Sequence, residues 1–439
     1  MLNLDEVRKN IILKEGIYYF DYTASGLAYE PIEQEILKFL KTYANTHSDS
    51  SSSAILTQRR YENARSELKN LLGLNDEFCL IGCGSGASAA IKKFQEIVGI
   101  YIPPKTKERY HIRPLSNLPL VILGPYEHHS NEVSFREGMC DVVRIGLDES
   151  GGVDFKMLEH VLKMNKNREI IASFSAASNV TGVLSDYKKI YALIKSYSGI
   201  LALDASSLSA YANVDSDYFD ALFLAPHKLL GGVGSCGLLA IKKSLVDTSL
   251  PTFAAGGTVA YVSRTSHQFV KNIEQLEEGG TPGIVQMIRA NLAYKLRNEI
   301  GFERIKSRES ELNELFASEL EKINEVVCYC PKNLPRVPIF AFNVRGISPY
   351  DFAATLSNDF GIQTRAGCAC AGPYGHDLLG LKDNVVFDKK PGWVRVSLHY
   401  THTKEDVIYL VQAIKKSIDK HKNSWGEELA LHSIFAGKI

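Results

Sequence analysis

The sequence predicts an α/β fold built on a mainly parallel sheet, followed by a smaller α+β domain. Short apolar runs alternate with helical segments between residues 120 and 242, and after the loop at 279–283 long helices surround two isolated strands. Buried strands separated by amphipathic helices are typical of parallel sheets. A chain of 439 residues is long enough for two or three domains.

The strands of the first unit are predicted at short runs of apolar residues, which lie at 121–124, 169–175, 200–205, 220–225 and 236–242. A helix is predicted over 186–197, because Ile190, Leu193, Ile194 and Tyr197 fall on one helical face. Between residues 102 and 119 the chain is rich in proline and charge. We interpret this stretch as a surface insertion, since helix–strand alternation resumes after it.

The second unit is predicted from a helix at 284–301, strands at 337–344 and 392–399, and an amphipathic helix at 404–421, with a cysteine-bearing loop between the two strands. We therefore expect an N-terminal segment (1–20) that packs on the small domain, a large α/β domain (21–285) and a small α+β domain (286–439).

The composition is that of an ordinary globular protein. Apolar residues make up 45% and charged residues 23%, and 50 basic residues balance 50 acidic ones. A nucleic-acid or membrane partner would favour a basic excess, so we expect neither. No apolar run reaches the roughly 18–20 residues of a membrane span, and the N-terminus lacks the apolar core of a signal peptide. Eight cysteines are too few for a disulfide scaffold, which favours a reducing, cytoplasmic location.

Several polar residues directly follow predicted strands, where the sites of α/β proteins assemble. Lys228 is a Schiff-base candidate, because a partly desolvated amine is nucleophilic. Asp204 could face a pyridinium nitrogen, Asn179 could donate to a ring hydroxyl, and the imidazole of His128 or His129 could stack on an aromatic ring. Taken singly, each is more commonly a surface side chain, a cap or a turn, and it is their occurrence after consecutive apolar runs that indicates a site.

The glycine-rich stretch GCGSGASAA at 82–90 precedes a predicted helix. Small residues there expose backbone N–H groups, and a helix N-terminus favours a phosphate. The stretch does not match the nucleotide-binding P-loop, so a plain glycine-rich turn is the alternative.

A second glycine-rich loop, TRAGCACAGPYGH at 364–376, contains Cys368 and Cys370. A metal site is one interpretation, but two cysteines supply only two ligands. The other C-x-C pair, Cys328 and Cys330, has strand-like surroundings that suit a closed zinc site poorly. We therefore predict no metal and favour a nucleophilic cysteine whose thiolate is stabilised by Arg365. Arg395 lies inside the apolar run 392–399 and requires a carboxylate partner, which is either a substrate or an internal acid.

The order of these motifs resembles the class V, fold-type I pyridoxal-phosphate enzymes, and among them the cysteine desulfurase and selenocysteine lyase group. The similarity extends from YYFDYTASG (18–26) to VRVSLHYTHTKEDV (394–407), and between them EHHSN, SNVTG, LDASS, PHK, EEGGTPG and RAGCACAGP follow the family's order and approximate spacing. The resemblance implies a large domain with a mainly parallel, seven-stranded type of sheet, pyridoxal 5'-phosphate as cofactor, and a homodimer.

The resemblance also implies roles around the cofactor ring. Lys228 would form the Schiff base and later move the proton, Asp204 would pair with the pyridine nitrogen, and His128 would stack on the ring. Asn179 would contact the ring oxygen. Ser207 stands where many members of the family have a glutamine that donates to that oxygen.

At the phosphate end, Ser85 and Gly86 fall on the family's phosphate loop, and His227 would also reach the phosphate. Thr281, with Thr258 as a second candidate, resembles the threonine that approaches the phosphate across a homodimer interface.

On the substrate side, Arg395 would hold the carboxylate with Arg365 nearby, and Cys370 falls on the cysteine that becomes a persulfide in the desulfurases. We therefore expect conversion of L-cysteine to L-alanine, with an acceptor protein or small thiol taking the sulfur. Cys368 either resolves the persulfide as a disulfide or is inert. Selenocysteine lyase, another carbon–sulfur lyase, an epimerase, an aminotransferase and a non-catalytic scaffold remain alternatives, because one fold hosts many functions.

Overall fold

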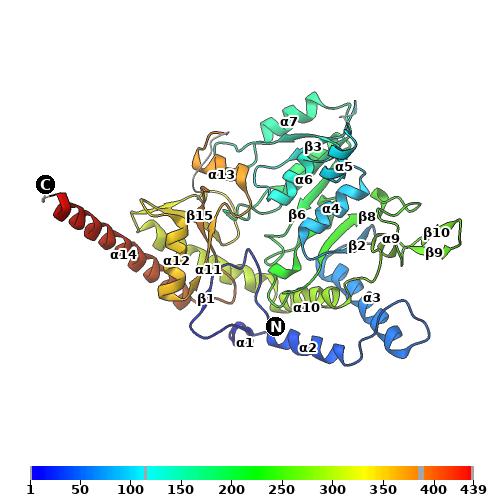
Figure 1. Ribbon diagram of the computed structural model, residues 1–439, viewed down its shortest axis with the longest axis horizontal. Helices are drawn as coiled ribbons and strands as arrows, with labels where there is room; N and C mark the ends of the chain where they lie inside the picture. Colours follow the sequence, from blue (N-terminus) through cyan, green and yellow to red (C-terminus); the bar gives the residue numbers. More distant parts are fainter. Residues whose placement is uncertain (1, 113–115, 384–389, 437–439) are drawn as a thin grey trace.

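A sheet of seven strands forms the centre of the computed structural model, which describes residues 2–112, 116–383 and 390–436 (Figure 1). Its strand order is β2-β8-β7-β6-β5-β3-β4. The strands are β2 (Phe78–Cys83), β3 (Leu120–Leu123), β4 (Asp141–Arg144), β5 (Ile170–Ser175), β6 (Ile200–Asp204), β7 (Ala221–Leu224) and β8 (Gly237–Lys242). Of these seven strands only β8 runs opposite to the others, so the predicted mainly parallel sheet is confirmed. Strands β2 and β4 were not predicted from the sequence.

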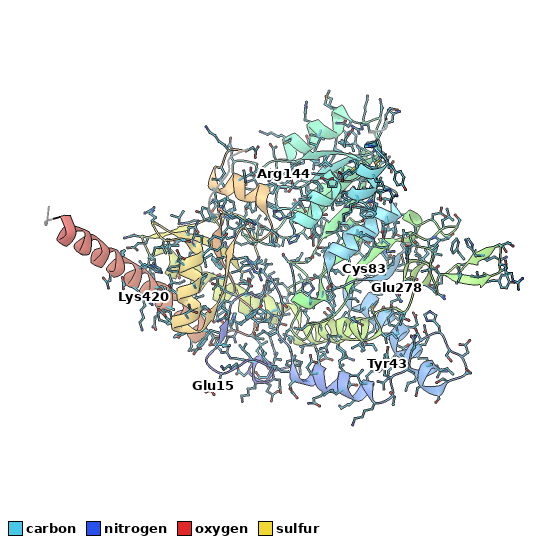
Figure 2. The ribbon with its side chains drawn as sticks, viewed as in Figure 1. Glu15, Tyr43, Cys83, Arg144, Glu278 and Lys420 are labelled. Atoms are coloured by element: carbon cyan, nitrogen blue, oxygen red, sulfur yellow. The ribbon has the colours of Figure 1, made fainter. Side chains whose placement is uncertain are left out.

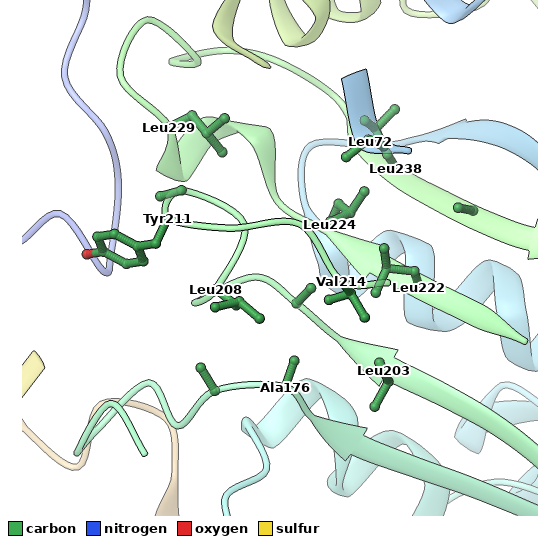
Figure 3. Close-up of a cluster of buried hydrophobic side chains, with 14 of the residues drawn as sticks. Leu72, Ala176, Leu203, Leu208, Tyr211, Val214, Leu222, Leu224, Leu229 and Leu238 are labelled. Atoms are coloured by element: carbon green, nitrogen blue, oxygen red, sulfur yellow. The ribbon is translucent and has the colours of Figure 1, made fainter. Parts of the chain in front are cut away.

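Both faces of this sheet are buried under helices. Successive residues of a strand point to opposite faces, and accordingly Leu80 and Ile81 belong to two different hydrophobic clusters. Helix α4 (Ala87–Ile97) covers one face, and α3 (Ser52–Leu72), α7 (Phe155–Met164), α8 (Tyr187–Ser196) and α10 (Ile284–Ile300) contribute to the cluster on the other. Figure 3 shows part of the second cluster, where Leu203, Leu222 and Leu238 lie on adjacent strands.

Helix α8 illustrates how the sequence specifies these elements. Asp186 caps its N-terminus by accepting a hydrogen bond from the backbone N–H of Lys189 (3.1 Å). Ile190 and Ile194 are fully buried against the sheet, so the helix predicted at 186–197 is confirmed.

A second, four-stranded antiparallel sheet has the order β11-β12-β15-β14. Its strands are β11 (Val326–Cys328), β12 (Ile339–Val344), β14 (Arg365–Gly367) and β15 (Trp393–Ser397), and helices α11 (Phe302–Glu321), α12 (Pro349–Phe360) and α14 (Lys404–Ala436) pack around it. The predicted strands at 337–344 and 392–399 are confirmed. Helix α14 extends beyond the predicted 404–421 and away from the body of the protein (Figure 1).

The N-terminal segment contacts the elements around this smaller sheet. Strand β1 (Tyr18–Tyr19) pairs in parallel with β13 (Ile362–Gln363), and Arg8 of α1 (Leu4–Lys9) forms an ion pair with Asp406. The division of the chain at residues 20 and 285 stays a prediction.

The remaining elements are mostly short. They are α2 (Glu30–Leu40), α5 (Pro104–Arg109), α6 (Val133–Arg136), α9 (Ile273–Glu277), α13 (Gly372–Leu379) and the hairpin β9 (Val259–Val262) and β10 (His267–Phe269), with 3₁₀ turns at His129–Asn131, Ser216–Tyr218, Pro226–Lys228 and Lys243–Leu245. Helix α5 lies within the predicted insertion at 102–119, whose residues 113–115 lie outside the described residues. In the part of the chain that the structure describes, no helix is long and apolar enough to cross a membrane.

Candidate active site

A cavity of about 240 Å³ opens where the parallel strands of the large sheet end. Strands β5, β6 and β7 finish at its wall, and the segment around residue 21, the cysteine loop and β15 close the opposite side. Most of the predicted site residues line it: Gly86, His128, Asn179, Asp204, Ser207, His227, Lys228, Arg365, Cys370 and Arg395. Ser85, Thr258 and Thr281 do not.

Lys228 ends the 3₁₀ turn that follows β7, and Asp204 is the last residue of β6. Burial lowers the pKa of Lys228 to about 8, although the carboxylate of Asp204 acts in the opposite direction. A fraction of the amine is therefore neutral near physiological pH and available as a nucleophile or base. Asp204 itself accepts a hydrogen bond from the backbone N–H of Ser206 (2.9 Å), which orients its carboxylate.

His128 lies in the turn after β3, and its Nδ1 accepts a hydrogen bond from the backbone N–H of Ser130 (3.1 Å). Burial lowers its pKa to about 4, with further lowering from the charge of Lys228. The imidazole is consequently neutral at pH 7 and presents a flat, uncharged face. Beneath it, Glu127 is buried and accepts hydrogen bonds from the backbone N–H (2.7 Å) and hydroxyl (2.8 Å) of Ser175.

The cysteine loop is attached to the large sheet through hydrogen bonds on both sides of Cys370. The backbone N–H of His129 donates to the carbonyl of Cys370 (2.7 Å), and Nε2 of His129 accepts from the backbone N–H of Gly372 (2.8 Å). The side-chain amide of Asn179 donates to the carbonyl of Ala369 (2.7 Å). Ala369 and Cys370 have φ values of 50° and 57°, a left-handed conformation that costs non-glycine residues energy. These contacts hold a strained loop with Cys370 exposed at the cavity.

Two arginines share one acid at the opposite wall. Asp21 accepts a hydrogen bond from Nη2 of Arg395 (2.8 Å) and another from Nε of Arg365 (3.0 Å). Arg395 also donates through Nη1 to the carbonyl of Asn179 (3.0 Å). The sequence left two kinds of carboxylate partner open for Arg395, an internal acid or a substrate. The structure contains the internal acid, Asp21, and a substrate carboxylate would be an additional partner.

The glycine-rich loop forms the far end of the cavity. A Cβ on Gly86 would lie 3.0 Å from Cε1 of His227, and one on Gly237 would lie 2.2 Å from the carbonyl oxygen of Gly86. The backbone at the start of α4 is thus accessible only because side chains are absent there. Glu278, which lies beside Cys83 (Figure 2), accepts a hydrogen bond from the backbone N–H of Gly82 (2.6 Å) and fixes the start of this loop.

The predicted threonines lie elsewhere in the single chain. Thr281 is exposed and accepts a hydrogen bond from Asn45 (3.4 Å), whereas Thr258 is buried and donates to the carbonyl of Ala255 (2.8 Å). Their contact with a phosphate across a dimer interface stays a prediction.

Comparison with known families identifies the chain. The model of the family described as "Aminotransferase class-V" matches residues 18–410. The chain belongs to the class V aminotransferase family. Enzymes of this family depend on pyridoxal phosphate.

Curated relatives of this class V aminotransferase include two archaeal proteins named "Probable cysteine desulfurase". The protein from Pyrococcus abyssi is 26% identical over 429 residues, which cover 96% of this chain and 99% of the relative. The protein from Methanothermobacter thermautotrophicus is 25% identical over 423 residues, which cover 94% of this chain and 98% of the relative.

Solved structures show the same fold. A cysteine desulfurase from Thermococcus onnurineus superposes with a TM-score of 0.80 and 24% identity, over 96% of this chain and 99% of its own. A cysteine desulfurase from Escherichia coli superposes with a TM-score of 0.77 and 22% identity, over 95% and 99%. The expected fold-type I architecture is thereby confirmed for this class V member.

The residues around the cavity fit pyridoxal phosphate. Four buried polar atoms of cavity-lining residues find no hydrogen-bond partner within the described residues: Asn179 Oδ1, Ser206 Oγ, His227 Nδ1 and Arg395 Nε. Buried polar groups are nearly always paired, so their concentration in one cavity indicates a polar ligand. The glycine-lined start of α4 leaves room for a phosphate, and the carboxylate of Asp204 is a suitable hydrogen-bond acceptor for a protonated ring nitrogen.

Asp21 and Glu127 were not predicted as contributors to this site, and His129 was predicted only as a candidate for stacking on a ring. Asp21 lies in the YYFDYTASG segment, where nothing but the resemblance drew attention to it. Glu127 and His129 belong to the EHHSN segment, but their roles depend on contacts with Ser175 and the cysteine loop. A buried arginine inside an apolar strand did signal that an acid such as Asp21 was required.

Proposed function

We propose that this chain is a pyridoxal-phosphate-dependent cysteine desulfurase that converts L-cysteine to L-alanine and transfers the sulfur to Cys370. The observation that most supports the proposal is that Cys370, Lys228 and Arg395 line one cavity although they come from separate parts of the chain. A thiol, an amine and a carboxylate-binding cation are the groups that the reaction requires. The names of the curated relatives support the same activity.

Pyridoxal phosphate, when bound, would withdraw electrons from Cα of the substrate and make the Cα proton acidic. Asp204 would accept a hydrogen bond from its ring nitrogen, and His128 would lie against the ring. Gly86 and His227 would lie beside its phosphate. Lys228, whose pKa is lowered to about 8, is the group suited to bond the cofactor and to move the Cα proton.

Arg395 and Arg365 would bind the substrate carboxylate. Together with Asp21 they have a net charge of +1, which one substrate carboxylate would neutralise. The Nε of Arg395 is buried and lacks a partner within the described chain, so it is a donor available for this purpose.

Cys370 would perform the sulfur transfer. Its thiolate attacks the sulfur of the substrate, and the Sγ–S bond forms as the Cβ–S bond breaks. The electron pair of the broken bond stays with the substrate carbon, which takes up a proton and leaves as alanine. Cys370 then holds the sulfur as a persulfide, from which a thiol of an acceptor protein or small molecule removes it.

The test compares the cofactor-loaded wild type with Cys370→Ser, using L-cysteine as substrate and alanine and sulfide as measured products. We expect Cys370→Ser to lose at least about 100-fold in alanine formation while keeping the visible absorption of bound cofactor. Cys140→Ser is the matched control, because Cys140 is half-buried, directly precedes β4 and does not line this cavity.

Three results would contradict the proposal: a protein that binds no pyridoxal phosphate, a Cys370→Ser variant as active as the wild type, or turnover of another amino acid with none of L-cysteine. The last result would show that the chain catalyses another reaction of the same family.

The proposal includes a homodimer and a reducing, cytoplasmic setting. All eight cysteines are free thiols, which is compatible with that setting. Thr281 lies on the exposed surface outside the cavity, and we propose that it reaches the phosphate of a second copy.

A further inference from the structure

Cys328 and Cys330 lie outside the active site, at a second cavity in the smaller sheet. The cavity measures about 560 Å³ and is bounded by β11 and α11, and none of its lining residues lines the cavity around Lys228. The two cysteines are separated only by Tyr329, and their thiols are hydrogen-bonded to each other. Cys328 is exposed and Cys330 is half-buried.

The surroundings of Cys330 favour a thiolate. The backbone N–H of Ala341 donates to Sγ of Cys330 (3.4 Å), and the thiol of Cys328 donates to it as well. The guanidinium of Arg336 is near, and it is held in place by a hydrogen bond to Asn313 (3.0 Å) and by stacking on Phe340 (4.1 Å to the ring centroid). Burial raises the pKa of Cys330, and the carbonyl of Ile339, 3.6 Å from Sγ, accepts a hydrogen bond from the thiol form only. The contacts with Cys328, Arg336 and Ala341 act in the opposite direction and lower the pKa to about 6.

The two thiols have opposite tendencies. The hydrogen bond to Cys330 raises the pKa of Cys328, which therefore stays protonated while Cys330 is ionised. Such an asymmetry separates an attacking thiolate from a resolving thiol. By contrast, burial raises the pKa of Cys79, Cys83 and Cys236 in the large sheet, which makes those thiols unreactive.

The cavity also has a charge preference. Lys332 is paired with Glu321 (2.9 Å), so these two charges cancel. Arg336, whose other side-chain partner Asn313 is neutral, is the counter-ion of the Cys330 thiolate, and its positive charge is left unpaired once that thiolate has bonded to another sulfur. A bound group that carries a carboxylate would replace the lost negative charge, so the site should favour small disulfides with carboxylate groups.

We propose that Cys328 and Cys330 form a second thiol site, independent of Cys370, that exchanges with small anionic disulfides and closes to a reversible disulfide. The two thiols are hydrogen-bonded to each other, so their sulfur atoms are already neighbours, as a disulfide requires. The site does not depend on the proposed desulfurase activity.

The exchange proceeds in two balanced steps. The thiolate of Cys330 attacks one sulfur of the disulfide RS–SR, forming a Cys330–SR bond and releasing RS⁻. Cys328 then loses its proton and attacks Sγ of Cys330, which forms the Cys328–Cys330 bond and releases the second RS⁻. The two cysteines are oxidised, and the disulfide is reduced to two thiols.

The test uses the cofactor-loaded full chain, with oxidised glutathione as the anionic probe and cystamine as the cationic one. Free thiols are alkylated after brief exposure, and the protein is digested with trypsin. Both cysteines fall in one tryptic peptide, residues 323–332, so the internal disulfide appears there as a loss of two hydrogens without alkylation. Cys370 falls in a different peptide.

We expect the wild type to form the internal disulfide, Cys328→Ser to stop at a glutathione adduct on Cys330, and Cys330→Ser to show neither product. Oxidised glutathione should react about tenfold faster than cystamine, and Arg336→Gln should remove that difference. Arg345→Gln is the matched control, because Arg345 is an exposed arginine that does not line the cavity.

The proposal fails if the peptide 323–332 stays fully alkylated while other cysteines of the same sample are oxidised. It also fails if Cys328 forms the adduct in Cys330→Ser, or if Arg336→Gln leaves the preference for oxidised glutathione unchanged. Retained cofactor absorption in each variant excludes misfolding as the cause of a lost reaction.

Discussion

The carboxylate of Asp21 lies 2.8 Å from Nη2 of Arg395, and the same carboxylate reaches Nε of Arg365 at 3.0 Å. One acid from the N-terminal segment thus connects two arginines that come from different strands of the smaller sheet. The three groups have a net charge of +1, because there are two cations and one anion. One substrate carboxylate would neutralise that charge.

Replacing Asp21 should therefore change which anions bind. In Asp21→Asn the arginine pair would have a charge of +2, and a dicarboxylate such as malonate should inhibit about tenfold more strongly, the lower range of a charged hydrogen bond. Inhibition by a monocarboxylate such as propionate should be strengthened less by the same substitution. Inhibition constants measured in the wild type and in Asp141→Asn, a surface acid paired with Arg168, provide the comparison. Equal gains for both inhibitors would contradict this charge balance.

Cofactor loading should depend on pH through Lys228. Its pKa is lowered to about 8 by burial, so the neutral amine increases as the pH rises, and the rate of pyridoxal phosphate attachment should rise through pH 8 and then level off. Asp204 raises the pKa of Lys228, so Asp204→Asn should move the midpoint to lower pH. Both pH profiles, that of the wild type and that of Asp204→Asn, are measured from the rate at which visible absorption appears when the cofactor is removed and added again. An unchanged or higher midpoint in Asp204→Asn would show that this carboxylate does not act on the amine.

His129 should act on the cysteine loop without affecting the cofactor. His129→Ala removes the acceptor for the backbone N–H of Gly372, so Cys370 would be held less firmly. We expect kcat for L-cysteine to fall about tenfold, equivalent to roughly 1.4 kcal/mol and similar to the loss of one hydrogen bond, with cofactor absorption retained. His160→Ala, an exposed histidine of α7, should have no effect. Loss of the cofactor in His129→Ala would instead point to a wider collapse of the site.

Glu127 should make the stability of the protein depend on pH. Burial raises its pKa to about 8, although hydrogen bonds from Asn131 and Ser175 act in the opposite direction. Its folded pKa exceeds the unfolded value, so the stabilisation is complete below about pH 4.5 and is lost as the pH rises towards 8. The free energy of unfolding should fall in this window by up to about 1.4 kcal/mol per pH unit.

Glu127→Gln, which cannot ionise, should lose this dependence, whereas Glu159→Gln on the exposed surface of α7 should keep it. Denaturant titrations across the window measure the slopes. Identical slopes in the wild type and Glu127→Gln would mean that Glu127 does not hold the proton.

The large sheet could be predicted because its central strands are nearly uniform apolar runs, and parallel topology brings the residues after them to one edge. Lys228, Asp204, Asn179 and His128 therefore meet in the structure as expected. Strand β4 was not predicted because it is short and only partly buried.

The contacts of Asp21 could not be predicted, because it is separated from Arg395 by 374 positions and no local pattern relates them. The threonine at 281 illustrates a different limit: its predicted role depends on a second copy of the chain. The chemistry of Cys330 was also hidden from the sequence, since it depends on a backbone N–H from β12 and an arginine fixed by α11.

The antiparallel strand β8 has a consequence for synthesis of the protein on the ribosome. It is the strand that pairs with β2, and Cys79 and Ile241, which face each other in that pair, are 162 positions apart. At about 5–20 residues per second, the apolar segment Phe78–Cys83 waits roughly 8–30 seconds for its partner to be translated. During that time its strand partner is missing, so we expect chaperones that bind nascent chains to recognise this segment.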